Sequence, residues 1–178
     1  MKQQWLWYAV LVTILLCAIA KGGTMSMTVS STAFGSHESV PSQYTCDGPD
    51  ISPPIAWDSV PLHAKSIALV CDDPDAPGGT WVHWVCYDIP PGTDSLAESQ
   101  PKTGALACGG KQGKNDFGHT GWGGPCPPSG THRYFFKVYC LDIMLNLPAG
   151  KTKKEVENAM KGHIIDKGEL VGVYSRAR

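Results

Sequence analysis

The stretch from Gly121 to Leu141, GWGGPCPPSGTHRYFFKVYCL, constrains the fold more than any other part of the 178-residue chain. Its first half is rich in glycine and proline, which form turns, and its second half is rich in aromatic and β-branched residues, which favour strands. Because alternate side chains of a strand point to opposite faces, we expect His132 and Tyr134 on one face and Arg133 on the other. An imidazole and a hydroxyl beside a glycine loop suit an anion, although both could equally be paired inside a β core.

The composition predicts one compact domain with a real hydrophobic core. Hydrophobic residues make up 42% of the chain and charged residues 17%. The formal net charge is −1, and removal of residues 1–20, which contain one base and no acid, would leave −2. Since no basic run or stripe is present, nucleic acid is not an expected partner.

The N-terminus has the pattern of a signal peptide. Lys2 precedes an apolar stretch from Trp5 to Cys17, and Ala18-Ile19-Ala20 supplies the small residues of a cleavage site. We therefore expect a signal peptide over residues 1–20 and a mature domain over 21–178 that is periplasmic or secreted and not transmembrane. An uncleaved anchor remains an alternative.

Six cysteines remain after Cys17 is set aside, and the sequence cannot choose among their possible pairings. Those in predicted strands, where a buried thiol is expected, are Cys71, Cys86 and Cys140. Those in predicted loops, which are better disulfide candidates in an oxidising compartment, are Cys46, Cys108 and Cys126. The absence of a C-x-x-C motif weakens zinc-ribbon and redox-enzyme interpretations.

Hydrophobic periodicity predicts several strands and one helix. The strands are expected over residues 27–34, from 55, over 66–71, 80–89, 133–141 and 170–174. In the fourth of these, alternation places His83 with Val85 and Tyr87, opposite Trp84. A T-x-x-E capping box at Thr152 begins the predicted helix, and its apolar positions are Val156, Ala159, Met160 and Ile164.

Three segments, read together, resemble the phosphatidylethanolamine-binding protein family, also called the Raf kinase inhibitor-like family. They are Asp73-Pro74-Asp75-Ala76-Pro77, His83-Trp84 and Gly130-Thr131-His132-Arg133-Tyr134. The resemblance extends to residues 47–48 with 52–54, to 123–128 and to 168–176, and so covers nearly all of the mature chain. The short spacing of the first two segments and the signal sequence are similar to the bacterial and archaeal branch.

The resemblance implies a mostly β fold: an antiparallel β-sandwich with a C-terminal α-helix and long loops. It also implies a small anion pocket, whose walls and backbone donors would come from Asp73, Asp75, His83, His132, Tyr134, Gly124, Pro125 and Cys126. A phosphoryl oxygen would accept hydrogen bonds from both histidines and from Tyr134, while Asp73 would accept the other N–H of a histidine. Arg133 would be structural and pair with Asp72 or Asp75.

The expected function is that of an exported, non-enzymatic binding protein for phosphorylated head groups, either phosphatidylethanolamine-like or other phosphate ligands, without a metal or cofactor. Binding should weaken as the pH rises through the histidine range. Three alternatives stay open. A hydrolase lacks a G-x-S-x-G motif and an evident nucleophile, the two histidines with carboxylates could hold zinc, and the resemblance also implies inhibitors or regulators of serine proteases and kinases.

Overall fold

The computed structural model describes residues 26–176, and the predicted signal peptide lies outside this range. The fold is mostly β, with two antiparallel sheets and one short helix, as expected. The larger sheet has the strand order β6-β4-β3-β7-β8: β3 (Ser66–Asp73), β4 (Trp81–Ile89), β6 (Lys111–Gln112), β7 (His132–Leu141) and β8 (Ile164–Tyr174). The smaller has the order β1-β2-β5: β1 (Val29–Ser30), β2 (Ile55–Trp57) and β5 (Ser95–Leu96). A 3-10 turn, η1 (Ser42–Tyr44), lies between β1 and β2.

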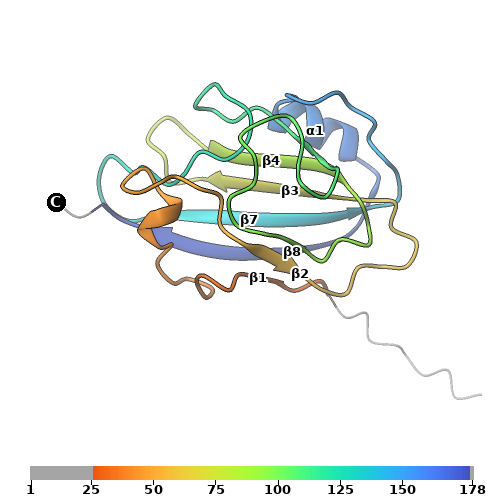
Figure 1. The fold of residues 1–178 in the computed structure, drawn as a ribbon, viewed down its shortest axis with the longest axis horizontal. Coiled ribbons are helices and arrows are strands. Elements are labelled where there is room, and N and C mark those ends of the chain that lie inside the picture. The colour runs from red at the N-terminus through yellow and green to blue at the C-terminus, as the bar shows by residue number, and fades with distance from the viewer. Residues whose placement is uncertain (1–25, 177–178) are drawn as a thin grey trace, which may run out of the picture.

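The large sheet separates two hydrophobic cores. Figure 1 shows β4, β3, β7 and β8 side by side, with α1 (Lys153–Met160) near the β4 edge. The main core lies between the two sheets and includes Trp57 from β2 and Trp84 from β4. Val156 and Met160 of α1 pack on the opposite face of the large sheet. No helix within residues 26–176 is long and apolar enough to cross a membrane.

The alternation expected for β7 is confirmed. His132, Tyr134 and Phe136 are buried on the side of the main core, whereas Arg133 and Lys137 point to the other face. β7 pairs antiparallel with β3 on one side and with β8 on the other, so its inward side chains are fixed by two neighbours. This central position gives His132 and Tyr134 a rigid support.

The alternation expected for β4 is wrong at His83, because a β-bulge interrupts it. Asp72 pairs with Val82 and Cys71 with Trp84, so His83 is an extra residue opposite β3. The bulge turns His83 and Trp84 to the same side, and their rings lie 6.3 Å and 5.7 Å from the ring of Trp122. Bulges of this kind re-aim side chains near functional sites.

The C-terminal region also differs from the expectation at one boundary. Thr152 caps α1 through the predicted capping box with Glu155, but the helix ends at Met160, and Ile164 is the first residue of β8. β8 is therefore longer than the predicted strand over residues 170–174. Gly168 lies within it, where a Cβ would come within 2.5 Å of the Met27 carbonyl oxygen. The glycine permits a close approach between chain segments and does not form a turn.

Candidate functional site

A pocket of about 440 Å³ lies where three strands of the large sheet begin or end. Asp73 is the last residue of β3, and His132 and Trp81 are the first residues of β7 and β4. Because β3 is antiparallel to both neighbours, these three positions meet at one end of the sheet. The lining residues come from strand ends and from three loop segments: Asp73, Ala76, Pro77, Gly78, Gly79, Thr80, Trp81, His83, Asp116, Phe117, Cys126, Pro127, Pro128 and His132.

His132 and Asp73 form a buried pair in the pocket wall. The Nδ1 atom of His132 lies 2.7 Å from Oδ2 of Asp73, and both residues are at least nine-tenths buried. The other carboxylate oxygen of Asp73 accepts the backbone N–H of Asp75 at 2.8 Å. Since Nδ1 of His132 is occupied by Asp73, Nε2 is the ring nitrogen that remains for a ligand. Asp73 thus holds a histidine tautomer, as the resemblance implied.

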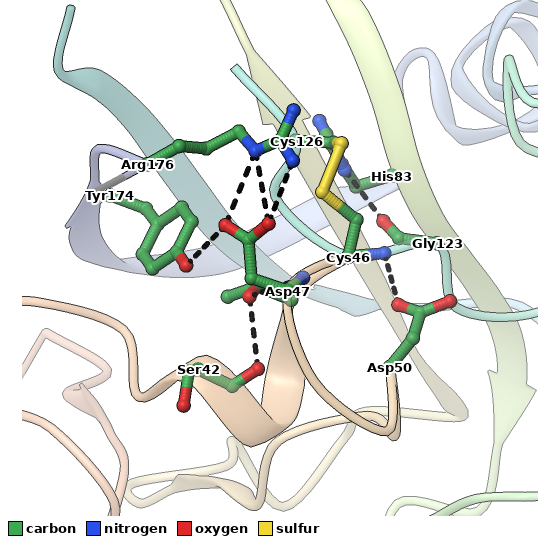
Figure 2. The surroundings of a disulfide bond; sticks show 11 residues. Ser42, Cys46, Asp47, Asp50, His83, Gly123, Cys126, Tyr174 and Arg176 are labelled. Carbon is green, nitrogen blue, oxygen red and sulfur yellow. Dashed lines mark hydrogen bonds and ion pairs between the residues drawn. A yellow bond between two sulfur atoms is a disulfide. The ribbon is translucent and has the colours of Figure 1, made fainter. Parts of the chain in front are cut away.

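His83 differs from His132, because its Nδ1 contacts a backbone carbonyl and its Nε2 has no hydrogen-bond partner. Its Nδ1 donates a hydrogen bond to the Gly123 carbonyl oxygen (Figure 2). The two atoms lie 2.6 Å apart, and the residue is 2% exposed. Burial lowers the pKa of His83 below its ordinary value, which favours the neutral ring. A neutral imidazole carries one proton, so Nε2 is an acceptor and not the donor that the resemblance implied.

Tyr134 provides a second unpaired polar atom next to His83. Within residues 26–176, His83 Nε2 and the Tyr134 hydroxyl are the buried side-chain atoms without a hydrogen-bond partner. The two rings meet edge to face, with centroids 5.1 Å apart. Burial raises the pKa of Tyr134 well above its ordinary value, so the hydroxyl keeps its proton. Tyr134 lies behind the pocket wall and does not line it.

The mouth of the pocket is aromatic and contains an acidic group. Trp81 and Phe117 are 37% and 41% exposed, and their rings meet edge to face at 5.4 Å. Phe117 also packs edge-on against His83 at 5.4 Å. Asp116 accepts the backbone N–H of Val82 at 2.8 Å, which fixes this turn to β4. The sequence analysis identified neither Asp116 nor Phe117 as a site residue.

Arg133 is a structural clamp, as expected, and its partner is Asp75. Its Nε and one terminal nitrogen lie 2.8 Å and 2.7 Å from the two oxygens of Asp75, and its backbone N–H adds a third contact. These contacts lower the pKa of Asp75 to about 2. Asp75 was predicted to line the pocket. Instead it lies outside the lining and joins the loop after β3 to the start of β7.

The loop from Gly123 to Cys126 was predicted to supply backbone donors to the pocket, but its groups have other partners. A disulfide joins Cys126 to Cys46 (Figure 2), so two of the three candidate cysteines are paired and Cys108 is free. The Gly124 N–H donates to Asp50 at 2.7 Å, so it is not available to a ligand. Gly124 and Pro125 do not line the pocket, whereas Cys126 does. Proline has no N–H, and the predicted backbone donors are therefore largely absent. The thiols expected to be buried are so: Cys71, Cys86 and Cys140.

The same loop region is tied to the C-terminal strand. Asp47, next to the disulfide, accepts hydrogen bonds from the Tyr174 hydroxyl at 2.8 Å and from Arg176 (Figure 2). Two segments that carry the family resemblance therefore contact each other at this point. Their role is to position the loop that bears Cys46 and, through the disulfide, Cys126.

The zinc alternative requires at least three ligating side chains close together. Within residues 26–176, no three histidine, cysteine, aspartate or glutamate side chains are grouped as a metal site would require. His83 and His132 lie in the same pocket, but each uses Nδ1 for a protein partner.

Comparisons with known proteins agree with the fold and show the family. The family model described as phosphatidylethanolamine-binding protein matches residues 30–175. A UPF0098 protein of Methanothermobacter thermautotrophicus is 51% identical over 150 residues, which cover 84% of this chain and 99% of the relative. A UPF0098 protein of Aquifex aeolicus is also 51% identical, over 87% of this chain and 91% of its own length.

Two crystal structures have the same fold. One is a phosphatidylethanolamine-binding protein homologue from Chlamydia trachomatis, with a TM-score of 0.79 and 39% identity. The other is E. coli YbcL, described as a member of the mammalian family, with a TM-score of 0.79 and 31% identity. Each match covers 85% of this chain and 99% of the other. The chain therefore belongs to the phosphatidylethanolamine-binding protein family, in its bacterial and archaeal UPF0098 branch.

Proposed function

We propose that this protein is a non-enzymatic binding protein whose pocket takes a small phosphorylated anion, either a free phosphate ester or a phospholipid head group. The observation that carries the proposal is the buried His132–Asp73 pair, with Nδ1 and Oδ2 2.7 Å apart in the pocket wall. A carboxylate on Nδ1 orients the imidazole and leaves Nε2 for the ligand. When the ring carries both protons, Nε2 donates a hydrogen bond to a phosphoryl oxygen.

The groups around the pair fit binding better than catalysis. Asp73 already accepts two hydrogen bonds, from His132 and from the Asp75 backbone, so it is not a free general base. Tyr134 keeps its proton, so its hydroxyl is not a general base. Cys126, the cysteine that lines the pocket, is oxidised to a disulfide and cannot act as a nucleophile in this form.

The aromatic mouth supports a ligand with an apolar or weakly polar substituent. Trp81 and Phe117 expose large ring surfaces beside the polar end of the pocket. A phosphate group could therefore enter first, with the remainder of the ligand against the two rings. Among residues 26–176, no lysine or arginine lines the pocket, so we expect modest affinity and a preference for ligands of low charge.

Isothermal titration calorimetry with inorganic phosphate and phosphorylethanolamine tests binding of free phosphates. Flotation with vesicles of phosphatidylethanolamine and phosphatidylcholine tests binding of phospholipid head groups. His132→Ala should abolish or strongly weaken binding of every phosphorylated probe. The chain offers a matched control in His163, whose Nδ1 pairs with Asp142 at 2.9 Å outside the pocket. His163→Ala should bind as the unmodified protein does, and equal binding by both variants would exclude the His132 pocket.

We also propose export to an oxidising compartment. The Cys46–Cys126 disulfide supports this, because such bonds persist mainly in the periplasm or outside the cell. Cell fractionation followed by N-terminal sequencing would detect the processed protein. Recovery of the unprocessed, reduced chain from the cytosol would contradict the proposal.

A further inference from the structure

His83 presents a buried hydrogen-bond acceptor that the rest of the protein leaves unpaired. The Gly123 carbonyl can only accept, so the 2.6 Å contact requires the proton on Nδ1 of His83. Its Nε2 then carries a lone pair, and no described residue donates to it. Buried polar atoms without a partner are rare and costly, so a ligand that supplies a donor would remove this cost.

The charged and titratable groups around His83 do not favour a second negative charge. They are Asp72 and Asp73 on β3, Asp116 in the loop before β7, and His132 and Tyr134 on β7. Asp72 is paired with Lys137 and Lys153, and Asp73 with His132. Asp116 is at the mouth without a cationic partner among the described residues. A monoanion meets less repulsion here than a dianion does.

Resting on the proposed function, we propose that the pocket selects a phosphate group that still carries one proton, the monoanion of a phosphomonoester. Its P–OH group donates to Nε2 of His83, and another of its oxygens accepts from Nε2 of His132. Phosphodiesters and sulfate esters have no such proton and leave Nε2 of His83 facing an oxygen lone pair. This separates the two ligand classes proposed above, because phospholipid head groups of the phosphatidylethanolamine type are phosphodiesters.

The decisive comparison uses methyl phosphate and methyl sulfate, whose monoanions have similar shape and equal charge and differ in the proton. Calorimetry near pH 6 should show methyl sulfate binding at least roughly tenfold more weakly, because a buried acceptor stays unsatisfied. Dimethyl phosphate should be weak for the same reason. Equal affinities for methyl phosphate and methyl sulfate would overturn the proton requirement and leave the anion pocket intact. If none of the three binds, the proposed function itself fails.

A pH series on the unmodified protein gives a second readout. A phosphomonoester loses its second proton near pH 6, so its affinity should fall by up to about tenfold per pH unit above that point. Methyl sulfate does not titrate in this range, so any change of its affinity with pH reports only the titration of protein groups. The slope for methyl phosphate should be steeper. Parallel slopes would contradict the inference.

Two variants separate His83 from its neighbour. Tyr134→Phe removes a hydroxyl that does not line the pocket and keeps the ring contact with His83, so the affinity ratio of the two anions should persist. In His83→Gln, the carboxamide can turn an N–H toward the ligand, so the preference for phosphate should collapse toward one. If the His83→Gln protein is folded, as judged by circular dichroism, and still prefers methyl phosphate over methyl sulfate to the full extent, another residue causes the preference. If this variant does not fold, the ligand comparison on the unmodified protein decides.

Discussion

Asp72 and Asp73 are consecutive residues of β3, but they serve opposite faces of the large sheet. Asp72 is 1% exposed and pairs with Lys137 at 2.8 Å and with Lys153 of α1, so both of its oxygens have cationic partners. Asp73 is 3% exposed and pairs with His132 in the pocket wall. On the helix side, the Asp72 carboxylate is thus fully paired with cations. On the pocket side, two buried atoms, on His83 and Tyr134, have no hydrogen-bond partner.

The difference indicates which buried polar groups serve the fold and which serve a ligand. When every charge in a buried cluster is paired, removing one partner leaves another charge uncompensated and destabilises the fold. Such a cluster has no free donor or acceptor for a ligand. A partly satisfied cluster lowers stability but offers directional hydrogen bonds to a ligand. The two sides should therefore respond differently when their members are removed.

The largest effect should come from isolating Asp72. Lys137→Met with Lys153→Met leaves a buried carboxylate without a partner, and we expect the free energy of unfolding to fall by about 3–5 kcal/mol. Urea denaturation measures this. The matched control uses two exposed lysines near the ends of α1, Lys154 and Lys161. Their Met variants should change stability by less than about 0.5 kcal/mol. If the double variant at Lys137 and Lys153 loses as little stability as the control, the two faces of the sheet do not differ as described.

The sequence could predict the side of the sheet on which these groups lie, because alternation in a regular strand is a local property. It placed His132 and Tyr134 opposite Arg133, and it found the capping box at Thr152. The charge of Arg133 and the nearby acidic loop also identified Asp75 as one of two possible partners.

What the sequence could not predict depends on contacts between distant segments. The bulge at His83 follows from its pairing with β3, and no residue type in TWVHWVCYDI marks it. The Gly123 carbonyl that fixes the His83 tautomer is a backbone atom, invisible to any motif. Similarly, the choice of Cys46 with Cys126 over Cys108 requires the folded positions of two loops that are 80 residues apart.

The second largest effect should come from the covalent link on the pocket side. Cys46→Ser with Cys126→Ser opens a loop that spans 80 residues, and we expect a loss of about 2–4 kcal/mol in the free energy of unfolding. Phosphate binding should weaken as well, since Cys126 lines the pocket. Cys108→Ser is the control. If the double variant binds phosphate normally, the pocket does not need this loop to be fixed.

A smaller loss should accompany acidification, and it should arise from His83. Burial lowers the pKa of His83 in the folded protein below the ordinary value of 6.5, so the unfolded chain binds more protons between the two values. The contribution of His83 to stability is therefore complete above pH 6.5 and declines as the pH falls below it. Urea denaturation between pH 7.5 and 5 measures the decline. It should be weaker in His83→Gln, and an equal decline in that variant would assign it to another group.

The smallest change should follow Tyr134→Phe. The hydroxyl is buried without a partner, so its removal should leave stability unchanged or raise it by up to about 1 kcal/mol, while the edge-to-face contact with His83 remains. Thermal and urea denaturation measure this. A clear loss of stability would reveal that the hydroxyl has a structural partner, such as a bound water.

The central claim is that Nε2 of His132 and Nε2 of His83 meet the ligand, and ¹⁵N NMR of the histidine rings tests it most directly. The chain has six histidines, which supply internal references. On titration with methyl phosphate, the largest ring-nitrogen shifts should fall on Nε2 of His83 and His132, with His83 protonated at Nδ1 before the ligand is added. Saturable binding that leaves both Nε2 signals unchanged would contradict the account.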